Sequence, residues 1–332
     1  MASNQPILSI IIPVYNVEDY IGECLNSVYN QDICDTQFEV ICVDDCSTDD
    51  SVHIIAVFQA LHDNLLLLHH SKNEKLGKTR NTGLSAAKGK YVWFVDSDDF
   101  IRENCFSVIV GQCEQNNLDI FHWTVMDNNG TILNPVIENG VMSGTDDVLK
   151  GNSPYWFAWD RVYRRDFLMD NNIWFSNERN GDILHTLSAL NLAHRVMGSD
   201  TGYYYYRKER TDSAMLSLQF VASKVYDFSF VMGGELLRLS NELKPDLVSV
   251  ALKHAVWQSN TAFRMAIKLP FREKVRFCKI IDSELKDDIW IILNAKNRIL
   301  IQFPFILYLC HIPYILVHCV RHIKCRSVNN KK

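Results

Sequence analysis

The sequence has no strong excess of charge of either sign and no paired-cysteine motif. Its 332 residues carry 34 Lys and Arg against 39 Asp and Glu, a formal net charge of −5, which argues against nucleic-acid binding through bulk charge. The 10 cysteines are scattered without a Cys-x-x-Cys pair, and no cleavable signal sequence precedes the first expected strand. We therefore expect reduced thiols in a cytosolic setting rather than a disulfide framework.

Patterns of strand and helix alternate over the first hundred residues. Four apolar runs are typical of buried strands, at residues 7–16, 38–45, 65–70 and 91–96. Apolar residues from Val17 to Val28 recur as on one helix face, residues 47–51 offer helix caps, and residues 78–90 have a helical composition. This alternation predicts an α/β fold with a mainly parallel sheet and helices on both faces.

Polar side chains follow these strands where they end. The residues at these positions are Tyr15, Asp44, Asp45, Asp96, Asp98 and Asp99. Ligands of open α/β sheets bind beyond the carboxyl ends of the strands, so we expect these residues to converge. Neighbouring carboxylates repel one another unless a cation or hydrogen-bond donors balance them, and oxygen-only ligands favour Mg²⁺ or Mn²⁺ over zinc. A solvated turn without a metal is the alternative, and the cluster alone leaves both open.

Four strings taken together resemble inverting glycosyltransferase family 2, which has the GT-A fold and here is of the type that builds bacterial polysaccharides and other glycans. They are SIIIPVYNVEDYIGECLNSVYNQ, VDDCSTDDS, KTRNTGLSAAKGKYVWFVDSDD and WDRVYRRDFL. The first three follow the order and spacing of the family over roughly residues 7–100, and a weaker match continues to about residue 213. The resemblance implies a nucleotide-diphosphate sugar as the donor and Mn²⁺ or Mg²⁺ as the cofactor.

The resemblance also implies roles for single residues around the donor. It places Pro13, Tyr15 and Asp45 at the base and ribose, Asp96 at the ribose or the metal, and Asp98 at the metal with Asp99 beside it. Arg80 would set a positive charge against the phosphates or the sugar, and an exposed helix arginine is the alternative. Cys46 stands where the family usually carries glycine, which puts the geometry of that loop in question.

The second half of the chain carries the expected acceptor side. Residues 121–140 are typical of a hairpin around Asn129-Gly130. The acceptor region of the family begins a helix with a Glu-Asp pair whose aspartate is the catalytic base, and here the pair is Gly181-Asp182. We expect Asp182 to be the base, with a simple helix cap as the alternative, although both can hold. His185, one turn further, is expected at the surface or the edge of the core.

Aromatic and basic residues near this region allow two interpretations each. Trp156 and Trp159 could stack on a sugar ring, and they could equally belong to the core. By resemblance, the loop with Arg207, Lys208 and Arg210 would close over the phosphates, and a solvated basic turn is the alternative.

The expected domains are a GT-A-like domain, a helical extension and a tail. They span residues 1–215 (nucleotide-binding half about 1–100, acceptor half about 101–215), 216–295 and 296–332. Residues 299–320 carry no formal charge and are long enough to span a bilayer. Two prolines and basic residues on both flanks favour an in-plane or re-entrant anchor at the cytoplasmic face, with a spanning helix or a buried core helix as alternatives. We therefore expect a cytoplasmic enzyme peripheral to the membrane.

The expected reaction is transfer of a sugar, with inversion, from a nucleotide sugar to a hydroxyl of a growing or lipid-linked glycan. A UDP-sugar is the expected donor, and a bound metal would assist the departure of the diphosphate. A nucleotidyltransferase is one alternative, but it would need a glycine-rich basic loop that PVYNVEDY does not provide. A catalytically inactive glycan-binding or scaffold protein is the other, and the missing acidic neighbour at Gly181 favours it.

Overall fold

The computed structural model describes residues 5–152, 156–176, 181–207, 239, 242–251 and 253. The chain divides into one compact unit of residues 1–210 and 243–247 and a second of residues 211–242 and 248–332. Nearly all of the expected helical extension (216–295) and the whole expected tail (296–332) lie outside the described residues. Within the described ranges, no helix combines the length and the apolar character needed to cross a membrane.

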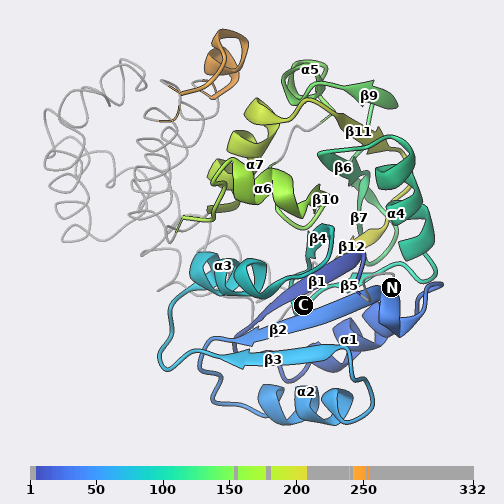
Figure 1. The fold of residues 1–332 in the computed structure, drawn as a ribbon, viewed down its shortest axis with the longest axis vertical. Helices are drawn as coiled ribbons and strands as arrows, with labels where there is room; N and C mark the ends of the chain where they lie inside the picture. Colours follow the sequence, from blue (N-terminus) through green and yellow to red (C-terminus); the bar gives the residue numbers. More distant parts are fainter. Residues whose placement is uncertain are drawn as a thin grey trace, which may run out of the picture. The chain divides into compact units, whose positions relative to one another are not determined.

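Two sheets organise the first unit (Figure 1). The larger has the strand order β3-β2-β1-β4-β10-β6-β11-β9, and the smaller has the order β5-β12-β7-β8. The strands are β1 (Leu8–Val14), β2 (Phe38–Asp44), β3 (Leu65–His69), β4 (Tyr91–Phe94), β5 (Phe100–Ile101), β6 (Ile120–Trp123), β7 (Val125–Asp127), β8 (Ile132–Asn134), β9 (Gly140–Met142), β10 (Arg161–Arg164), β11 (Val196–Ser199) and β12 (Tyr204–Tyr206). The helices are α1 (Ile21–Tyr29), η1 (Asp35–Gln37, a 3₁₀ helix), α2 (Ser51–Gln59), α3 (Leu76–Ala86), α4 (Phe106–Gln115), α5 (Gly144–Leu149), α6 (Arg165–Asp170) and α7 (Gly181–Leu192).

The larger sheet is mainly parallel, as the sequence predicts. Strands β1 to β4 pair in parallel through β1–β2, β2–β3 and β1–β4, and β6 pairs in parallel with β11. Strand β10 is antiparallel to both of its neighbours, β4 and β6. It joins β4, which is followed by residues 96–99 (the acidic turn), to the second half of the domain.

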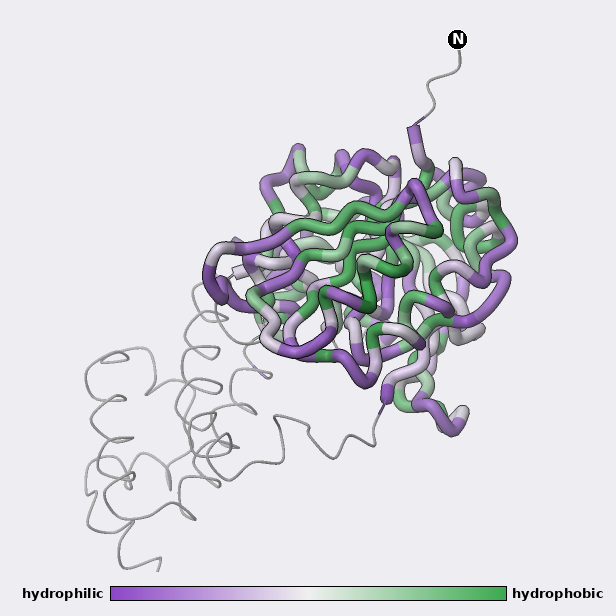
Figure 2. The backbone as a smooth tube through the Cα atoms, turned by 90° about the horizontal axis from the view of Figure 1, so that it is seen from below, coloured by the Kyte–Doolittle hydropathy of each residue, from purple (hydrophilic) through white to green (hydrophobic). Residues whose placement is uncertain are grey.

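Helices cover both faces of this sheet. Ile10 and Ile12 of β1 belong to one buried cluster with the apolar stripe of α1. Ile11, which points to the opposite face, packs on α3, where a Cβ on Gly83 would lie 2.3 Å from its Cγ2 atom. Figure 2 shows the hydrophobic residues concentrated along these central strands. All seven residues of β1 are buried, which explains its continuous apolar run.

Two helices begin at residues other than those expected. Helix α1 starts at Ile21 rather than near Val17. The carbonyl oxygen of Val17 accepts hydrogen bonds from the N–H groups of Tyr20 and Ile21, which form a turn before the helix. Helix α3 covers Leu76–Ala86 rather than 78–90. Gly89 follows it at a close approach, since a Cβ there would lie 2.6 Å from Ser9 Oγ.

The expected hairpin around Asn129-Gly130 is present between β7 and β8. These strands pair antiparallel, and the backbone N–H of Asp127 donates to the carbonyl of Thr131. Gly130 has φ +78°, the left-handed conformation that glycine adopts without strain.

We predict that Gly83→Ala destabilises the fold by about 1–3 kcal/mol, because the new methyl group must displace the buried Ile11 side chain. The matched control is Gly111→Ala in α4, where a Cβ meets nothing within 4 Å. That substitution should stabilise the protein by about 0.4–1 kcal/mol through helix formation. Urea denaturation measures both, and equal effects of the two variants would contradict the packing of α3 on β1.

Candidate functional site

The carboxyl ends of β1, β2 and β4 lie at one edge of the sheet and bring residues of the expected donor site together. Tyr15 directly follows β1 and is 50% exposed. Asp45 follows β2 and is buried, and Asp96 follows β4 by two residues. A half-exposed aromatic ring and two carboxylates at the same edge of the sheet are suited to a ligand that stacks and donates hydrogen bonds.

Pro13 lies inside β1, one residue before the end of the strand. It is opposite Val43 of β2, beyond Ile11, where the pairing of β1 with β4 stops. The missing N–H of the proline therefore interrupts no ladder hydrogen bond with β4.

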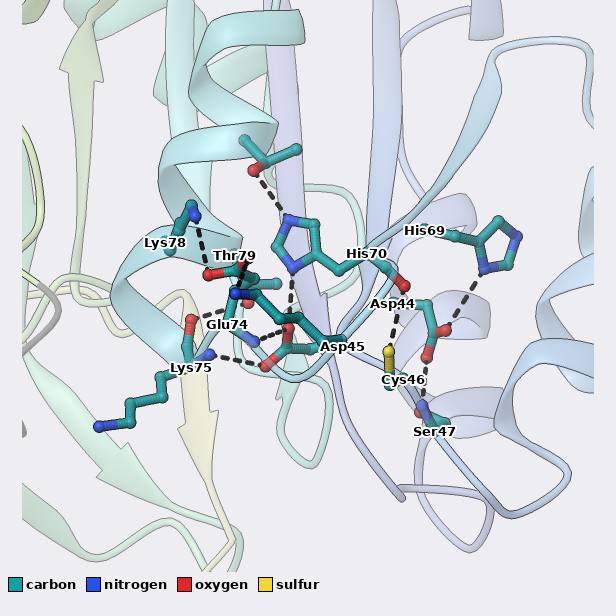
Figure 3. A network of polar contacts seen from close by, with 12 residues as sticks. Asp44, Asp45, Cys46, Ser47, His69, His70, Glu74, Lys75, Lys78 and Thr79 are labelled. Carbon is teal, nitrogen blue, oxygen red and sulfur yellow. Dashed lines mark hydrogen bonds and ion pairs between the residues drawn. The ribbon is translucent and has the colours of Figure 1, made fainter.

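Asp45 anchors the segment that leads from β3 into α3 (Figure 3). Its Oδ1 accepts a hydrogen bond from the backbone N–H of Glu74 (2.7 Å), and its Oδ2 accepts one from that of Lys75 (2.9 Å). Nδ1 of His70 also lies 2.8 Å from Asp45 Oδ1, and Nε2 of the same ring lies 2.9 Å from Thr82 Oγ1. Asp45 therefore fixes the entry to α3 in addition to its place at the expected nucleotide edge.

Two residues of this network hold left-handed backbone conformations. Lys75, the residue before α3, has φ +73°, and Cys46 has φ +65°. This conformation costs a residue with a Cβ roughly 1–2 kcal/mol. A glycine would adopt it freely, so Cys46 keeps a loop shape that glycine would form more easily. The Cys46 thiol lies 3.1 Å from the carbonyl oxygen of His70, which ties the loop to β3.

Arg80 connects the two halves of the candidate site. Its side chain is 1% exposed, so the alternative of an exposed helix arginine is wrong. Nη1 donates to Asp182 Oδ1, and Nη2 donates to Asp96 Oδ1 at 2.6 Å. The ring of Phe175 lies 5.2 Å from the guanidinium carbon. One planar cation thus holds the expected base and the first carboxylate of the acidic turn.

These ion pairs set the charges of the site. Burial alone would lower the pKa of Arg80, but Asp182 and Asp96 outweigh it and raise the pKa, so the guanidinium stays protonated. Burial raises the pKa of Asp96 to about 6, because the opposing effect of Arg80 is smaller and Asp98 and Asp182 add negative charge. A further cation at this position would relieve the repulsion between the carboxylates.

Asp99 is directed into the protein and held by the end of β12. It is 2% exposed, its Oδ2 accepts a hydrogen bond from the Tyr204 hydroxyl (2.6 Å), and its Oδ1 accepts one from the backbone N–H of Arg207 (2.8 Å). Burial, together with the charges of Asp98 and Asp96, raises the pKa of Asp99 well above its usual range. Both carboxylate oxygens of Asp99 therefore already have protein partners. The place of Asp99 beside a metal stays a prediction.

The donor atoms of the acidic turn fit a divalent cation that is shared with a substrate. Within the described part of the chain, no three His, Cys, Asp or Glu side chains are grouped as a complete metal site. Mg²⁺ in nucleotide sites is commonly held by one or two carboxylates, while phosphate oxygens and water complete the shell. Asp96 and Asp98 are such a pair, and the negative charge of Asp98 adds to the burial that raises the pKa of Asp96.

Asp182 lies in the first turn of α7, and its side chain is 19% exposed. Its neighbour Gly181 is closely packed, since a Cβ there would lie 2.7 Å from the carbonyl oxygen of Ser176. The same carbonyl would lie 2.0 Å from a Cβ on Gly77 of α3. An acidic side chain at position 181 would therefore require the backbone at Ser176 to move.

His185 belongs to the core and not to its edge. It is 1% exposed and stacks on Phe175 with ring centroids 3.8 Å apart. Burial lowers the pKa of His185 well below its usual range, and the positive charges of Arg80 and Arg161 add to this, so the ring is neutral. The expectation of a surface or core-edge position was wrong, because the ring packs against Phe94, Tyr163 and Phe175.

The two tryptophans follow the core interpretation. Trp156 and Trp159 are 4% and 5% exposed. Trp159 stacks on Phe157 and on Tyr204 at centroid distances of 4.6 and 4.4 Å. Their burial places both rings in the core.

Of the three basic residues expected over the phosphates, Arg207 is described, and Lys208 and Arg210 lie outside the described residues. Arg207 is not in a solvated turn, since its Nε donates to the carbonyl oxygen of Asp98 (2.9 Å) and its Nη2 to Glu23 (2.5 Å). The sequence analysis missed Tyr204, which donates to Asp99 of the turn, and Glu23, which pairs with Arg207. No local pattern pointed to these two contacts, because the paired residues are 105 and 184 positions apart in sequence.

Comparison with known proteins agrees with the motifs. Residues 9–171 match Glycosyl transferase family 2. The chain is 34% identical over 214 residues to the uncharacterized glycosyltransferase EpsJ of Bacillus subtilis, which covers 61% of each protein. It is 31% identical over 272 residues to the poly(ribitol-phosphate) beta-N-acetylglucosaminyltransferase TarS of Staphylococcus aureus, covering 79% of this chain and 46% of TarS. The chain therefore spans only about half the length of these relatives.

Solved structures share the fold. Residues 1–349 of S. aureus TarS in complex with UDP-GlcNAc match with a TM-score of 0.69 and 26% identity, covering 92% of this chain and 88% of that one. The mannosyltransferase PcManGT of Pyrobaculum calidifontis, in complex with GDP-Man and Mn²⁺, matches with a TM-score of 0.56 and 14% identity, covering 96% and 87%. The second likeness concerns the fold alone, and together they confirm the expected GT-A-type α/β architecture.

We predict that Arg80→Met lowers the free energy of unfolding by about 2–4 kcal/mol at pH 7, because two carboxylates lose their shared cation. The loss should shrink at pH 5. Without Arg80 the pKa of Asp96 rises above about 6, so that this side chain is neutral at pH 5.

The matched control for Arg80→Met is Lys78→Met on the same helix. Lys78 is half-exposed and pairs with Glu74, so its removal should cost only about 0.3–0.5 kcal/mol. Urea denaturation at pH 5 and pH 7 measures both variants. A loss at Arg80 that does not depend on pH, or that equals the loss at Lys78, would contradict the double ion pair.

Proposed function

Because residues 9–171 belong to glycosyl transferase family 2, we propose that this chain transfers a sugar from a UDP-sugar to a hydroxyl of a growing glycan, with inversion at the anomeric carbon. The observation that carries the proposal is the Arg80 bridge, which puts the expected base Asp182 beside Asp96 of the expected donor site. The likeness to TarS in complex with UDP-GlcNAc supports a UDP-sugar as donor. The poly(ribitol-phosphate) in the name of that relative supports a polymeric acceptor with free hydroxyl groups.

In the proposed reaction, Asp182 accepts the proton of the acceptor hydroxyl while the hydroxyl oxygen attacks the anomeric carbon. The bond from that carbon to the diphosphate oxygen breaks, and its electron pair leaves with the UDP. The hydrogen bond from Arg80 to Asp182 Oδ1 orients the carboxylate toward this task. Attack from the face opposite the leaving group produces the inversion.

The donor would lie along the strand ends on the other side of Arg80. Tyr15 and Asp45 would border the base and ribose, with Pro13 beneath them. The hydrogen bonds that Asp45 accepts from the backbone N–H groups of Glu74 and Lys75 keep the adjoining loop in place. Binding and proton transfer thus rely on different residues, which allows them to be tested separately.

A divalent cation bound at the acidic turn would neutralise the charge that develops on the departing diphosphate. Asp98 and Asp96 would hold it. Asp96 would then be paired with two cations, Arg80 and the metal. Both would favour its charged form, whereas burial raises its pKa.

If Asp182 is the base, Asp182→Asn should lower the rate of transfer by about 10²–10⁴-fold, because the amide keeps the shape but cannot accept a proton. UDP affinity, measured by calorimetry, should change little. A thermal-shift screen of UDP-glucose, UDP-galactose and UDP-N-acetylglucosamine selects the donor for single-turnover assays. The matched control is Asp166→Asn, an exposed aspartate in the first turn of α6. An unchanged rate, or a loss of UDP affinity as large as the loss of rate, would remove Asp182 from this role.

The metal proposal is tested by UDP binding alone. UDP should bind wild-type protein more tightly in Mn²⁺ or Mg²⁺ than in EDTA, and Asp98→Asn should abolish this difference because it removes a ligand charge. Asp63→Asn, at an exposed residue between α2 and β3, should retain it. Equal UDP affinity of the wild type with metal and with chelator would rule out the metal.

A further inference from the structure

Arg207, which follows β12, binds the acidic turn after β4 through its backbone and its side chain. Arg207 donates its backbone N–H to Asp99 Oδ1 (2.8 Å) and its Nε to the carbonyl oxygen of Asp98 (2.9 Å). One residue thus contacts both aspartates that end the turn. Tyr204 of the same strand adds its hydroxyl, which donates to Asp99 and lies 3.3 Å from the backbone nitrogen of Asp96.

The guanidinium of Arg207 is itself held on three sides. Its Nη2 donates to Glu23 of α1 at 2.5 Å. The rings of Tyr20 and Phe100 each lie 5.4 Å from the guanidinium carbon, within the range of cation–π attraction. The side chain is 17% exposed. An arginine with this many partners has lost most of its freedom to follow a ligand.

We propose that Arg207 is a positioning residue that presents Asp98 to the metal and its diphosphate, and that Glu23 holds Arg207 in this place. The inference rests on the proposed function, because it concerns the same metal-bound donor. A hydrogen bond to the Asp98 carbonyl oxygen fixes the peptide whose side chain is the expected metal ligand. Small displacements of a ligand matter, because Mg²⁺ and Mn²⁺ demand near-octahedral geometry at short distances.

A direct contact between Arg207 and the phosphates is the competing explanation. The two explanations predict different changes in UDP affinity when Glu23 is neutralised. If Arg207 bound phosphate directly, Glu23 would compete for it, and neutralising Glu23 would leave UDP affinity unchanged or raise it. If Arg207 is an anchor, neutralising Glu23 loosens it and lowers the affinity that depends on metal.

The experiment measures UDP binding by calorimetry in Mn²⁺ and in EDTA for full-length Arg207→Gln, Arg207→Lys and Glu23→Gln. Arg207→Gln removes charge-assisted hydrogen bonds and should weaken UDP binding in Mn²⁺ by about ten- to a hundred-fold. Binding in EDTA should change by less than about two-fold, because base and ribose contacts remain. Arg207→Lys should lie between wild type and Arg207→Gln, since lysine keeps the charge but not the fork that reaches both Asp98 and Glu23.

Glu23→Gln should weaken UDP binding in Mn²⁺ by about two- to five-fold, as expected for an ion pair whose acid is half-exposed. The Glu23→Gln variant also tests the inference by itself if Arg207→Gln does not fold. Arg195→Gln is the matched control, because this exposed arginine also donates its Nε to a backbone carbonyl, that of Asn116 (2.8 Å). It should bind UDP like the wild type in both conditions.

Three results would overturn the inference: wild-type UDP affinity of Arg207→Gln in Mn²⁺, an equal loss in Mn²⁺ and EDTA, or unchanged or tighter binding by Glu23→Gln. Each of them requires that the wild type itself binds UDP more tightly with metal. A wild type without this difference would overturn the metal of the proposed function, and the inference with it. The two failures are therefore distinguishable.

Discussion

The described domain depends on one buried cation that two carboxylates from distant parts of the chain share. Arg80 reaches Asp96 after β4 and Asp182 at the start of α7, 16 and 102 residues away in sequence. An unpaired guanidinium would be costly to bury, so the fold must deliver both carboxylates to the same place. The nucleotide-binding half and the acceptor half are thereby held in one geometry at the point where the proposed reaction takes place.

The surroundings of α3 follow from this requirement. Glycines at positions 77 and 83 let the helix approach the Ser176 carbonyl on one side and Ile11 of β1 on the other. Asp45 holds the start of the helix through Lys75, and this hydrogen bond helps to offset the strain of the left-handed backbone there. Phe175 closes the arrangement, because it lies against Arg80 and stacks on the neutral His185. The close packing of α3 and the backbone conformation of Lys75 thus hold the Arg80 guanidinium in position.

The sequence was sufficient where a local pattern determines the structure, and insufficient where distant residues do. The apolar runs predicted β1 to β4 and their parallel arrangement, and the Gly-Asp pair predicted the start of α7. Strand β10 between β4 and β6 could not be foreseen, because a short run such as Arg161–Arg164 carries no information about its neighbours. Arg80 was open for the same reason, since the helical pattern of residues 78–90 does not tell which face meets Asp182. The domain limits, the metal and the membrane tail stay predictions.

The glycine at position 181 bears on whether the protein is a catalyst or an inactive relative. Its family position usually holds an acidic residue, and the loss of that residue favoured an inactive scaffold. In the structure the Ser176 carbonyl fills the space that a side chain at 181 would need, and the same carbonyl packs against Gly77. The close contact of this segment with α3 also places Phe175 beside Arg80. The absence of an acidic residue at this position is therefore accounted for by packing that supports the Arg80 bridge, while Asp182 keeps its carboxylate on Arg80.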